Sequence, residues 1–223
     1  MTAQEIYELG VDYQSNGNYD QASKCYEQAL NLGLMPDSTI LFNMGISYLN
    51  TGVYDEARVC LNECVSQNPD AATYCDLGDA YYGINDYTQA IKCYEKAVGL
   101  NPDNPIKAMA YSNLGVIFSQ VYKDNDKAIE YTKLAIKAKP NYVLYYCNLG
   151  HYYRSEGDYA NSIKSYKAAI KLQPDFIKAY HDLEIVYRDN GQHKEANECY
   201  IRSVQIGTEK LNERINYFRR RNI

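Results

Sequence analysis

The sequence contains no tryptophan, and it has only 6 prolines and 3 histidines among its 223 residues. It has no apolar run near the roughly 20 residues that a membrane-spanning helix requires, so we expect no membrane span. The opening MTAQEIYELG lacks the basic and apolar segments of a secretory signal. A formal net charge of -5 argues against general binding of nucleic acid, because that binding needs a basic face.

Motifs of catalysis are missing as well. The sequence has no glycine-rich phosphate loop, no HExxH zinc motif and no serine in a strand–turn–helix elbow. The nearest pair of nucleophile and base is Cys147 with His151, and neither an oxyanion hole nor an orienting partner accompanies it. We therefore expect a protein that is not an enzyme and needs no cofactor.

Tyrosine, by contrast, is abundant, with 25 copies, and many of these tyrosines fall in a repeated pattern. A glycine that follows an apolar residue and precedes an aromatic residue by three positions occurs five times, and a sixth copy has glutamate in place of glycine. We call these positions the anchors; they are Gly10, Gly45, Gly78, Gly115, Gly150 and Glu184. Small residues follow the anchors at 12 and 19 positions and a large residue follows at 16, although the fourth copy needs one extra turn residue to keep this register.

This pattern, with its period of about 34 residues, resembles the tetratricopeptide repeat. The resemblance implies an all-α fold, namely a right-handed superhelical α-solenoid of six helix–turn–helix hairpins. Small anchors let the two helices of a hairpin approach closely, and tyrosines fill the space between neighbouring hairpins. The expected solenoid covers residues 3–207, with repeats at 3–37, 38–70, 71–107, 108–142, 143–176 and 177–207.

Residues 208–223 are expected to form a capping helix and a basic end. Leu211, Ile215 and Phe218 share one helical face, which would cover the exposed end of the stack. The arginines of this segment would then face solvent, and a role in nucleic-acid binding or sorting stays open as an alternative; they are Arg214, Arg219, Arg220 and Arg221.

Turn and cap residues separate the expected helices. Five prolines precede an acidic or amide residue, which predicts the end of one hairpin and the cap of the next; the pairs are Pro36-Asp37, Pro69-Asp70, Pro102-Asp103, Pro140-Asn141 and Pro174-Asp175. Within the hairpins, glycine or asparagine occupies the turn and predicts a positive φ; these residues are Gly17, Gly52, Asn85, Gly157 and Gly191.

The resemblance also implies that the first helices of the hairpins line a concave groove. In the family, the ligand-facing positions lie six, three and two residues before the anchor and one, four and five after it. Two residues before the anchor, this chain has Asn43, Asn113 and Asn148, with Asp76 and Asp182 as acidic variants. Asparagine both donates and accepts hydrogen bonds, so this ladder could hold the backbone of an extended peptide. The alternative is that asparagine is simply tolerated on a helix surface.

Charge also varies along the predicted groove. Glu8, Asp76 and Asp79 are acidic positions of its N-terminal half, whereas cations and two histidines occupy its C-terminal half. A ligand with a basic end and an acidic end would suit this pattern. The predicted peptide contacts are Asn43, Asn113, Asn148, Asp76, Asp182, Lys178, Arg154, His151 and His181.

The chaperone-binding branch of the family holds the carboxylates of Hsp70 and Hsp90 tails with lysine, arginine and asparagine. Only Asn43 agrees with that clamp, and the positions that would need cations include Ala72 and Asp76. The resemblance therefore argues against chaperone tails as partners.

The 7 cysteines are an odd number without the framework of a small secreted domain, so we expect reduced thiols and a cytoplasmic protein. Four of them fall fifteen residues after their anchors and are interpreted as one packing position; they are Cys25, Cys60, Cys93 and Cys199. Cys147, His151 and His181 share the groove face and have zinc-ligand chemistry. We interpret them as parts of a peptide site and predict no metal.

The sequence thus predicts a non-catalytic scaffold or adaptor that binds a peptide segment of a partner protein in its groove. Two alternatives stay open. The repeats could be the regulatory or targeting region of a larger enzyme or assembly, or the chain could self-assemble, with one chain's terminal helix in another's groove.

Overall fold

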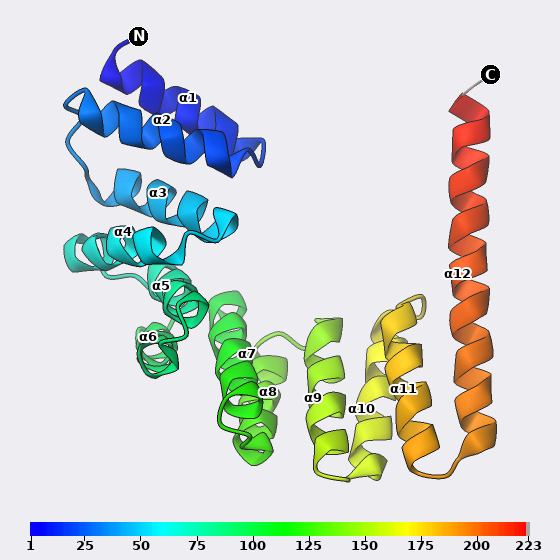
Figure 1. Ribbon diagram of the computed structural model, residues 1–223. Helices are drawn as coiled ribbons and strands as arrows, with labels where there is room; N and C mark the ends of the chain where they lie inside the picture. The colour runs from blue at the N-terminus through cyan, green and yellow to red at the C-terminus, as the bar shows by residue number, and fades with distance from the viewer. Residues whose placement is uncertain (222–223) are drawn as a thin grey trace. The chain divides into compact units, whose positions relative to one another are not determined.

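In the computed structural model the chain folds into consecutive pairs of α-helices (Figure 1). The structure describes residues 1–221, and side chains as far as residue 217. Over these residues it has twelve helices and no strand, which confirms the expected all-α fold. The helices are α1 (Ala3–Ser15), α2 (Tyr19–Asn31), α3 (Ser38–Thr51), α4 (Tyr54–Gln67), α5 (Ala71–Gly83), α6 (Tyr87–Gly99), α7 (Asn104–Gln120), α8 (Asn125–Ala138), α9 (Val143–Ser155), α10 (Tyr159–Leu172), α11 (Ile177–Asp189) and α12 (His193–Arg221).

The helices belong to two compact units, which we call the first unit (Met1–Leu114) and the second unit (Gly115–Ile223). Within each unit a helix packs most extensively on its partner in the hairpin, as α5 does on α6 and α9 on α10. The second helix of a hairpin then packs on the first helix of the next, as α4 does on α5 and α10 on α11. This pattern is that of stacked helix hairpins.

The anchor glycines are sites of very close helix approach. A Cβ atom built on Gly78 would lie 2.6 Å from the ring of Tyr94, and one on Gly45 would lie 2.6 Å from Leu61. Gly10 with Tyr26 and Gly150 with Tyr166 repeat this contact. Because these partners are almost completely buried, they have no space into which to retreat. Glycine is therefore required by packing in these hairpins.

The sixth hairpin departs from this packing at its anchor. Glu184 is buried there, and its Oε1 atom lies 2.7 Å from Nη2 of Arg188. Tyr200 is the residue that corresponds to Tyr94, yet its side chain is 51% exposed. The glutamate side chain needs the space that a tyrosine ring fills elsewhere, which explains why Tyr200 lies outside the hairpin interface.

The predicted turn conformations are confirmed. All five turn residues have positive φ, for example 77° at Gly52 and 64° at Asn85. In the longer connection between α7 and α8, Lys123 has a φ of 57°. This connection holds the extra residue that the fourth repeat was expected to contain.

The predicted caps are confirmed in part. Asp37 accepts a hydrogen bond from the backbone of Ile40, and Asp70 and Asp103 cap α5 and α7 in the same way. The prediction is wrong for Asn141 and Asp175, because α9 and α11 begin two residues after them without a side-chain cap. At both places a tyrosine from the first turn of the following helix forms a hydrogen bond with the proline carbonyl. The hydroxyl of Tyr146 donates to the carbonyl of Pro140, and that of Tyr180 donates to the carbonyl of Pro174.

The end of the chain also differs from expectation. Helix α12 runs without a break from His193 to Arg221, so residues after 207 continue it and form no separate capping helix. Leu211 and Ile215 are 58% and 40% exposed and do not cover a neighbouring helix. Arg214 is exposed, as expected. The side chains of Phe218, Arg219, Arg220 and Arg221 lie outside the described residues.

The glycine contact leads to a prediction about stability. Replacing Gly10 by alanine should destabilise the chain by about 1–3 kcal/mol, since the new Cβ would lie 2.7 Å from the fully buried Tyr26 ring. The matched control is Gly99→Ala, also in a helix of the first unit, where a Cβ would meet no atom within 4 Å. The control should be neutral or stabilising, because alanine favours helices over glycine. Urea unfolding measures both, and equal stabilities would contradict the packing explanation.

Candidate functional site

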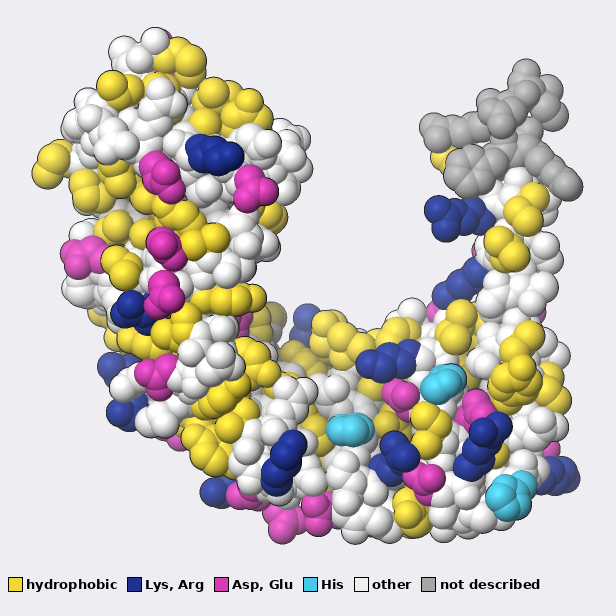
Figure 2. Space-filling view, in the orientation of Figure 1, with side chains coloured by type: hydrophobic (Ala, Val, Ile, Leu, Met, Phe, Trp, Pro, Cys, Tyr) yellow, Lys and Arg dark blue, Asp and Glu magenta, His cyan; other side chains and the backbone are white. Residues whose placement is uncertain are grey.

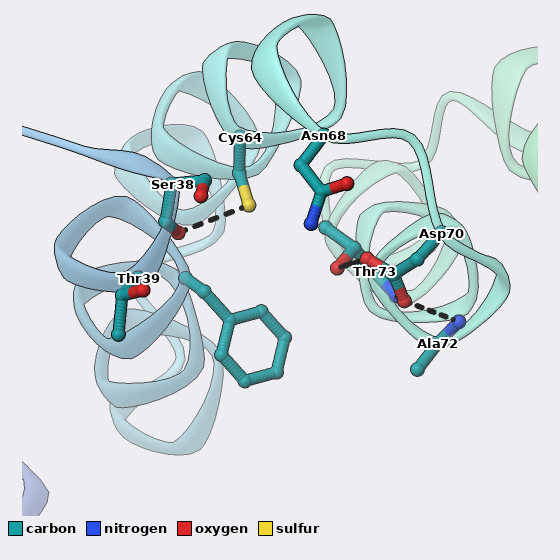
Figure 3. Close-up of a pocket in the computed structure, with 8 residues that line it drawn as sticks. Ser38, Thr39, Cys64, Asn68, Asp70, Ala72 and Thr73 are labelled. Atoms are coloured by element: carbon teal, nitrogen blue, oxygen red, sulfur yellow. Dashed lines mark hydrogen bonds between the residues drawn. The ribbon is translucent and has the colours of Figure 1, made fainter.

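Two cavities hollow the face that α3 and α5 present to solvent in the first unit. One, of about 270 Å³, we call the Phe42 pocket; it is lined by Ser38, Thr39, Phe42, Cys64, Asn68, Asp70, Ala72 and Thr73 (Figure 3). The other, of about 350 Å³, we call the Asp76 pocket; it is lined by Ile46, Leu49, Asn50, Tyr54, Asp76, Asp79, Tyr82 and Gly83.

These cavities coincide with the ligand-facing positions predicted for the second and third repeats. Of those twelve positions, ten line one of the two pockets, and the exceptions are Asn43 and Cys75. Cys75 is fully buried beneath the surface. The predicted positions of these two repeats therefore line cavities, and their contact with a ligand stays a prediction.

The polar groups of the Phe42 pocket are largely used by the fold. Asp70 accepts hydrogen bonds from the backbone of Ala72 and Thr73 and from the Thr73 hydroxyl, and the Cys64 thiol donates to the carbonyl of Ser38 at 3.2 Å. Figure 3 shows the amide of Asn68 pointing into the pocket. A ligand would therefore meet mainly an aromatic ring and one amide here.

The Asp76 pocket contains carboxylates without a neutralising cation. Oδ1 of Asp79 accepts hydrogen bonds from the Tyr94 hydroxyl at 2.5 Å and from the Asn113 amide at 2.9 Å. Burial raises the pKa of Asp79, and burial together with the charges of Asp79 and Asp70 raises the pKa of Asp76 to about 7. Among the described residues, no lysine, arginine or histidine forms an ion pair with either side chain.

The asparagine ladder has a structural role that the sequence interpretation missed. The Asn43 amide donates to the Tyr7 hydroxyl at 2.9 Å, and the Asn113 amide donates to Asp79, so each joins two successive first helices. Asn148 makes no side-chain hydrogen bond within the described residues and is half-buried. The sequence did contain a signal for these hydrogen bonds: donor and acceptor are separated by 36 and 34 residues, which is close to the length of one repeat.

In the second unit, α9 and α11 bring several predicted contacts together. Burial raises the pKa of Asp182, and nearby basic side chains oppose that change; these are Lys178, His181, His151 and Arg154. Arg154 also reaches across to α11, with its Nε atom 2.6 Å from Oδ2 of Asp189. Figure 2 shows acidic and basic side chains interspersed around the histidines on this unit. Carboxylates and cations therefore largely neutralise one another here.

The cysteine near these histidines is poorly suited to nucleophile chemistry. Loss of hydration lowers the pKa of His151, with Arg154 adding to the effect, and burial raises the pKa of the Cys147 thiol to about 11. A thiol with so high a pKa is a weak nucleophile and a poor metal ligand. No group of three metal-ligating side chains is found in the part of the chain that the structure describes.

The cysteines fifteen residues after the anchors are packing residues. Cys60 and Cys93 are buried, and burial raises the pKa of each thiol to about 11. Cys25 and Cys199 are half-buried.

None of the helices formed by residues 1–221 is long and apolar enough to cross a bilayer.

Comparison with known families and structures agrees with the fold. Models of the tetratricopeptide repeat match residues 2–70, 71–104 and 143–176. The crystal structure of MamA protein superposes with a TM-score of 0.68 and 27% identity, covering 78% of this chain and 94% of that one. MamA from residue 41 onwards of Desulfovibrio magneticus RS-1 gives 0.68 and 22%, covering 79% and 98%.

A further similar structure is the C-terminal part of a TPR repeat-containing protein from Cytophaga hutchinsonii. It has a TM-score of 0.76 and 16% identity, and the match covers 92% of this chain and 80% of that one. Comparison with the curated proteins finds no sequence match.

The Asp76 carboxyl gives rise to a prediction about pH. Its pKa is about 7 in the folded chain against an ordinary value of 3.8, so between these pH values the folded chain retains a proton that the unfolded chain releases. This contribution to the free energy of unfolding is complete below the ordinary pKa and is lost as pH rises through the folded one. Asp76→Asn removes the contribution.

As the pH rises from about 5 to about 8, the free energy of unfolding of the variant should therefore increase by roughly 2 kcal/mol relative to that of the natural chain. Unfolding in urea at both pH values measures the difference. Asp12→Asn, at an exposed position of α1, is the control and should show little change with pH. If the difference in stability between the Asp76→Asn variant and the natural chain stayed constant with pH, a half-buried carboxyl with a raised pKa would be ruled out at position 76.

Proposed function

Because the chain belongs to the tetratricopeptide repeat family, whose repeats generally act as protein-interaction scaffolds, we propose that it captures an extended segment of a partner protein on the faces of its first helices. The observation that carries this proposal is the coincidence of ten ligand-facing positions with two cavities on α3 and α5. Cavities in line along two helices offer successive sites for the side chains of an extended peptide.

The chemistry of the two units supports a role in binding without catalysis. The first unit offers an aromatic pocket and an acidic pocket, and α9 of the second unit offers the amide of Asn148, which makes no side-chain hydrogen bond within the described residues. Within the described residues no hydrogen bond uses the half-buried side-chain amide of Asn148, in contrast to the amides of Asn43 and Asn113, so this amide can donate to and accept from a peptide backbone. A peptide that lies over the second unit would therefore find a partner for its backbone in Asn148.

The test selects peptides from a random displayed library on the full chain and measures their affinity for variants. Phe42→Ala and Asn148→Ala should each weaken peptides that lie over their sites by about tenfold. Val59→Ala, which removes an exposed apolar side chain from the second helix α4, serves as control and should leave the affinity unchanged. Melting temperatures establish that each variant is folded.

Two results would contradict this proposal. The library could yield no binder, or the selected peptides could depend on Val59 and not on Phe42 or Asn148.

Self-association is a second candidate, and the observation that favours it is an apolar stripe along α12. Tyr200, Val204, Leu211 and Ile215 recur at helical spacing, and each is at least 40% exposed. An unpartnered stripe of this kind could pair with a second copy of the chain.

Light scattering should then give a mass above that of one chain, and the double substitution Leu211→Glu with Ile215→Glu should return it to the monomer value. Gln205→Glu, at an exposed polar position of α12 outside the stripe, is the control. A monomeric natural chain at high concentration would rule out this candidate.

A further inference from the structure

The Asp76 pocket combines a negative end with an apolar wall. Asp76 and Asp79 supply the charge, while Ile46 and Leu49 from α3 and the two tyrosines Tyr54 and Tyr82 supply aliphatic and aromatic surface. At about 350 Å³ the cavity has room for one long side chain together with water.

The aromatic wall is held in place by contact with the backbone. A Cβ atom on Gly83 would lie 2.3 Å from Cγ of Tyr54, so the Tyr54 ring rests directly against the last turn of α5. Tyr82 packs against Tyr87, with ring centroids 5.5 Å apart in an edge-to-face arrangement. The pocket therefore has a defined shape before any ligand enters.

The acidic end is fixed in position and lacks a counter-ion. Hydrogen bonds from Tyr94 and Asn113 hold Oδ1 of Asp79, which orients the carboxylate. Asp76 accepts no hydrogen bond among the described residues, and neither carboxylate has an ion-pair partner there. Two like charges that are partly removed from water are unfavourable without a cation, and a bound cation would relieve both.

We propose that the Asp76 pocket receives a lysine or arginine side chain of the captured partner segment. The cationic head lies between Asp76 and Asp79, and the methylene stem lies along the apolar wall against Tyr54 and Tyr82. This combination suits a basic side chain, because its stem is apolar and its head can interact with both carboxylates and aromatic faces. The inference rests on the proposed function, since it concerns the segment that the first helices capture.

The second unit makes a useful contrast. There Lys178 and Arg154 counteract the rise that burial causes in the pKa of Asp182, and Asp189 is paired with Arg154. A basic side chain would gain little at those carboxylates. The preference for lysine or arginine should therefore belong to the Asp76 pocket alone.

The experiment uses peptides selected from the random library on the full chain. Peptides that bind the first unit should share a lysine or arginine at one position. For one lysine-containing peptide, a partner is made with norleucine at that position, which keeps the stem and removes the charge. The natural chain should bind the norleucine peptide about tenfold more weakly than the lysine peptide.

The matched variant is Asp76→Asn, chosen because asparagine is the native residue at this repeat position in Asn43, Asn113 and Asn148. In this variant the two peptides should bind with nearly equal affinity, whereas Asp12→Asn should preserve the tenfold difference. Raising the salt concentration should weaken the lysine peptide more than the norleucine peptide on the natural chain, and this measurement needs no variant.

The outcomes separate this inference from the function on which it rests. Selected peptides without a shared basic residue, or an unchanged tenfold difference in Asp76→Asn, would overturn the pocket assignment and leave peptide capture intact. A library that yields no binder at all would overturn peptide capture, and the pocket assignment with it.

Discussion

The close approach of an anchor glycine to a large side chain on the second helix is the contact on which the rest of the structure depends. It sets the distance between the helices of a hairpin and so fixes the surface that the first helix presents. In the first and third hairpins the hydroxyl of this large residue, a tyrosine, continues past the glycine to that surface. Tyr26 donates to Gln14 and Tyr94 donates to Asp79, and both acceptors occupy ligand-facing positions. Packing residues thus also orient the residues of the site.

The two units treat their charges differently. In the second unit, carboxylates on α11 lie beside cations of the same chain, and Arg154 joins α9 to α11 through Asp189. In the first unit, Asp76 and Asp79 lie in a pocket where neutral hydrogen-bond donors, and no cation of the described residues, contact the carboxylate of Asp79. Repeats with the same backbone can therefore present either a neutralised surface or a charged cavity, depending on a few side chains.

Much of the fold could be predicted because its determinants are local and recur in every repeat. Glycine at Gly52 and asparagine at Asn85 determine turns within a few residues, and both predictions are confirmed. The predictions of caps at Asn141 and Asp175 were wrong because α9 and α11 begin two residues after them. At both places a tyrosine hydroxyl, of Tyr146 or Tyr180, donates to the preceding proline carbonyl. The positions that line the two pockets could be named from the sequence, and their contact with a ligand stays a prediction. The pockets themselves and the internal hydrogen bonds of Asn43 and Asn113 could not be predicted, because they depend on contacts between different repeats.

Two glycines of α5 have separate effects, which matters for how such a chain can diversify. Gly78 controls the distance to α6, whereas Gly83 controls where the Tyr54 ring lies in the wall of the Asp76 pocket. A larger residue at position 83 would displace that ring without entering the hairpin interface. The shape of the cavity is therefore adjustable by a single substitution at small cost to the repeat itself. The shape of this cavity can therefore change by gradual sequence drift while the helical framework is preserved.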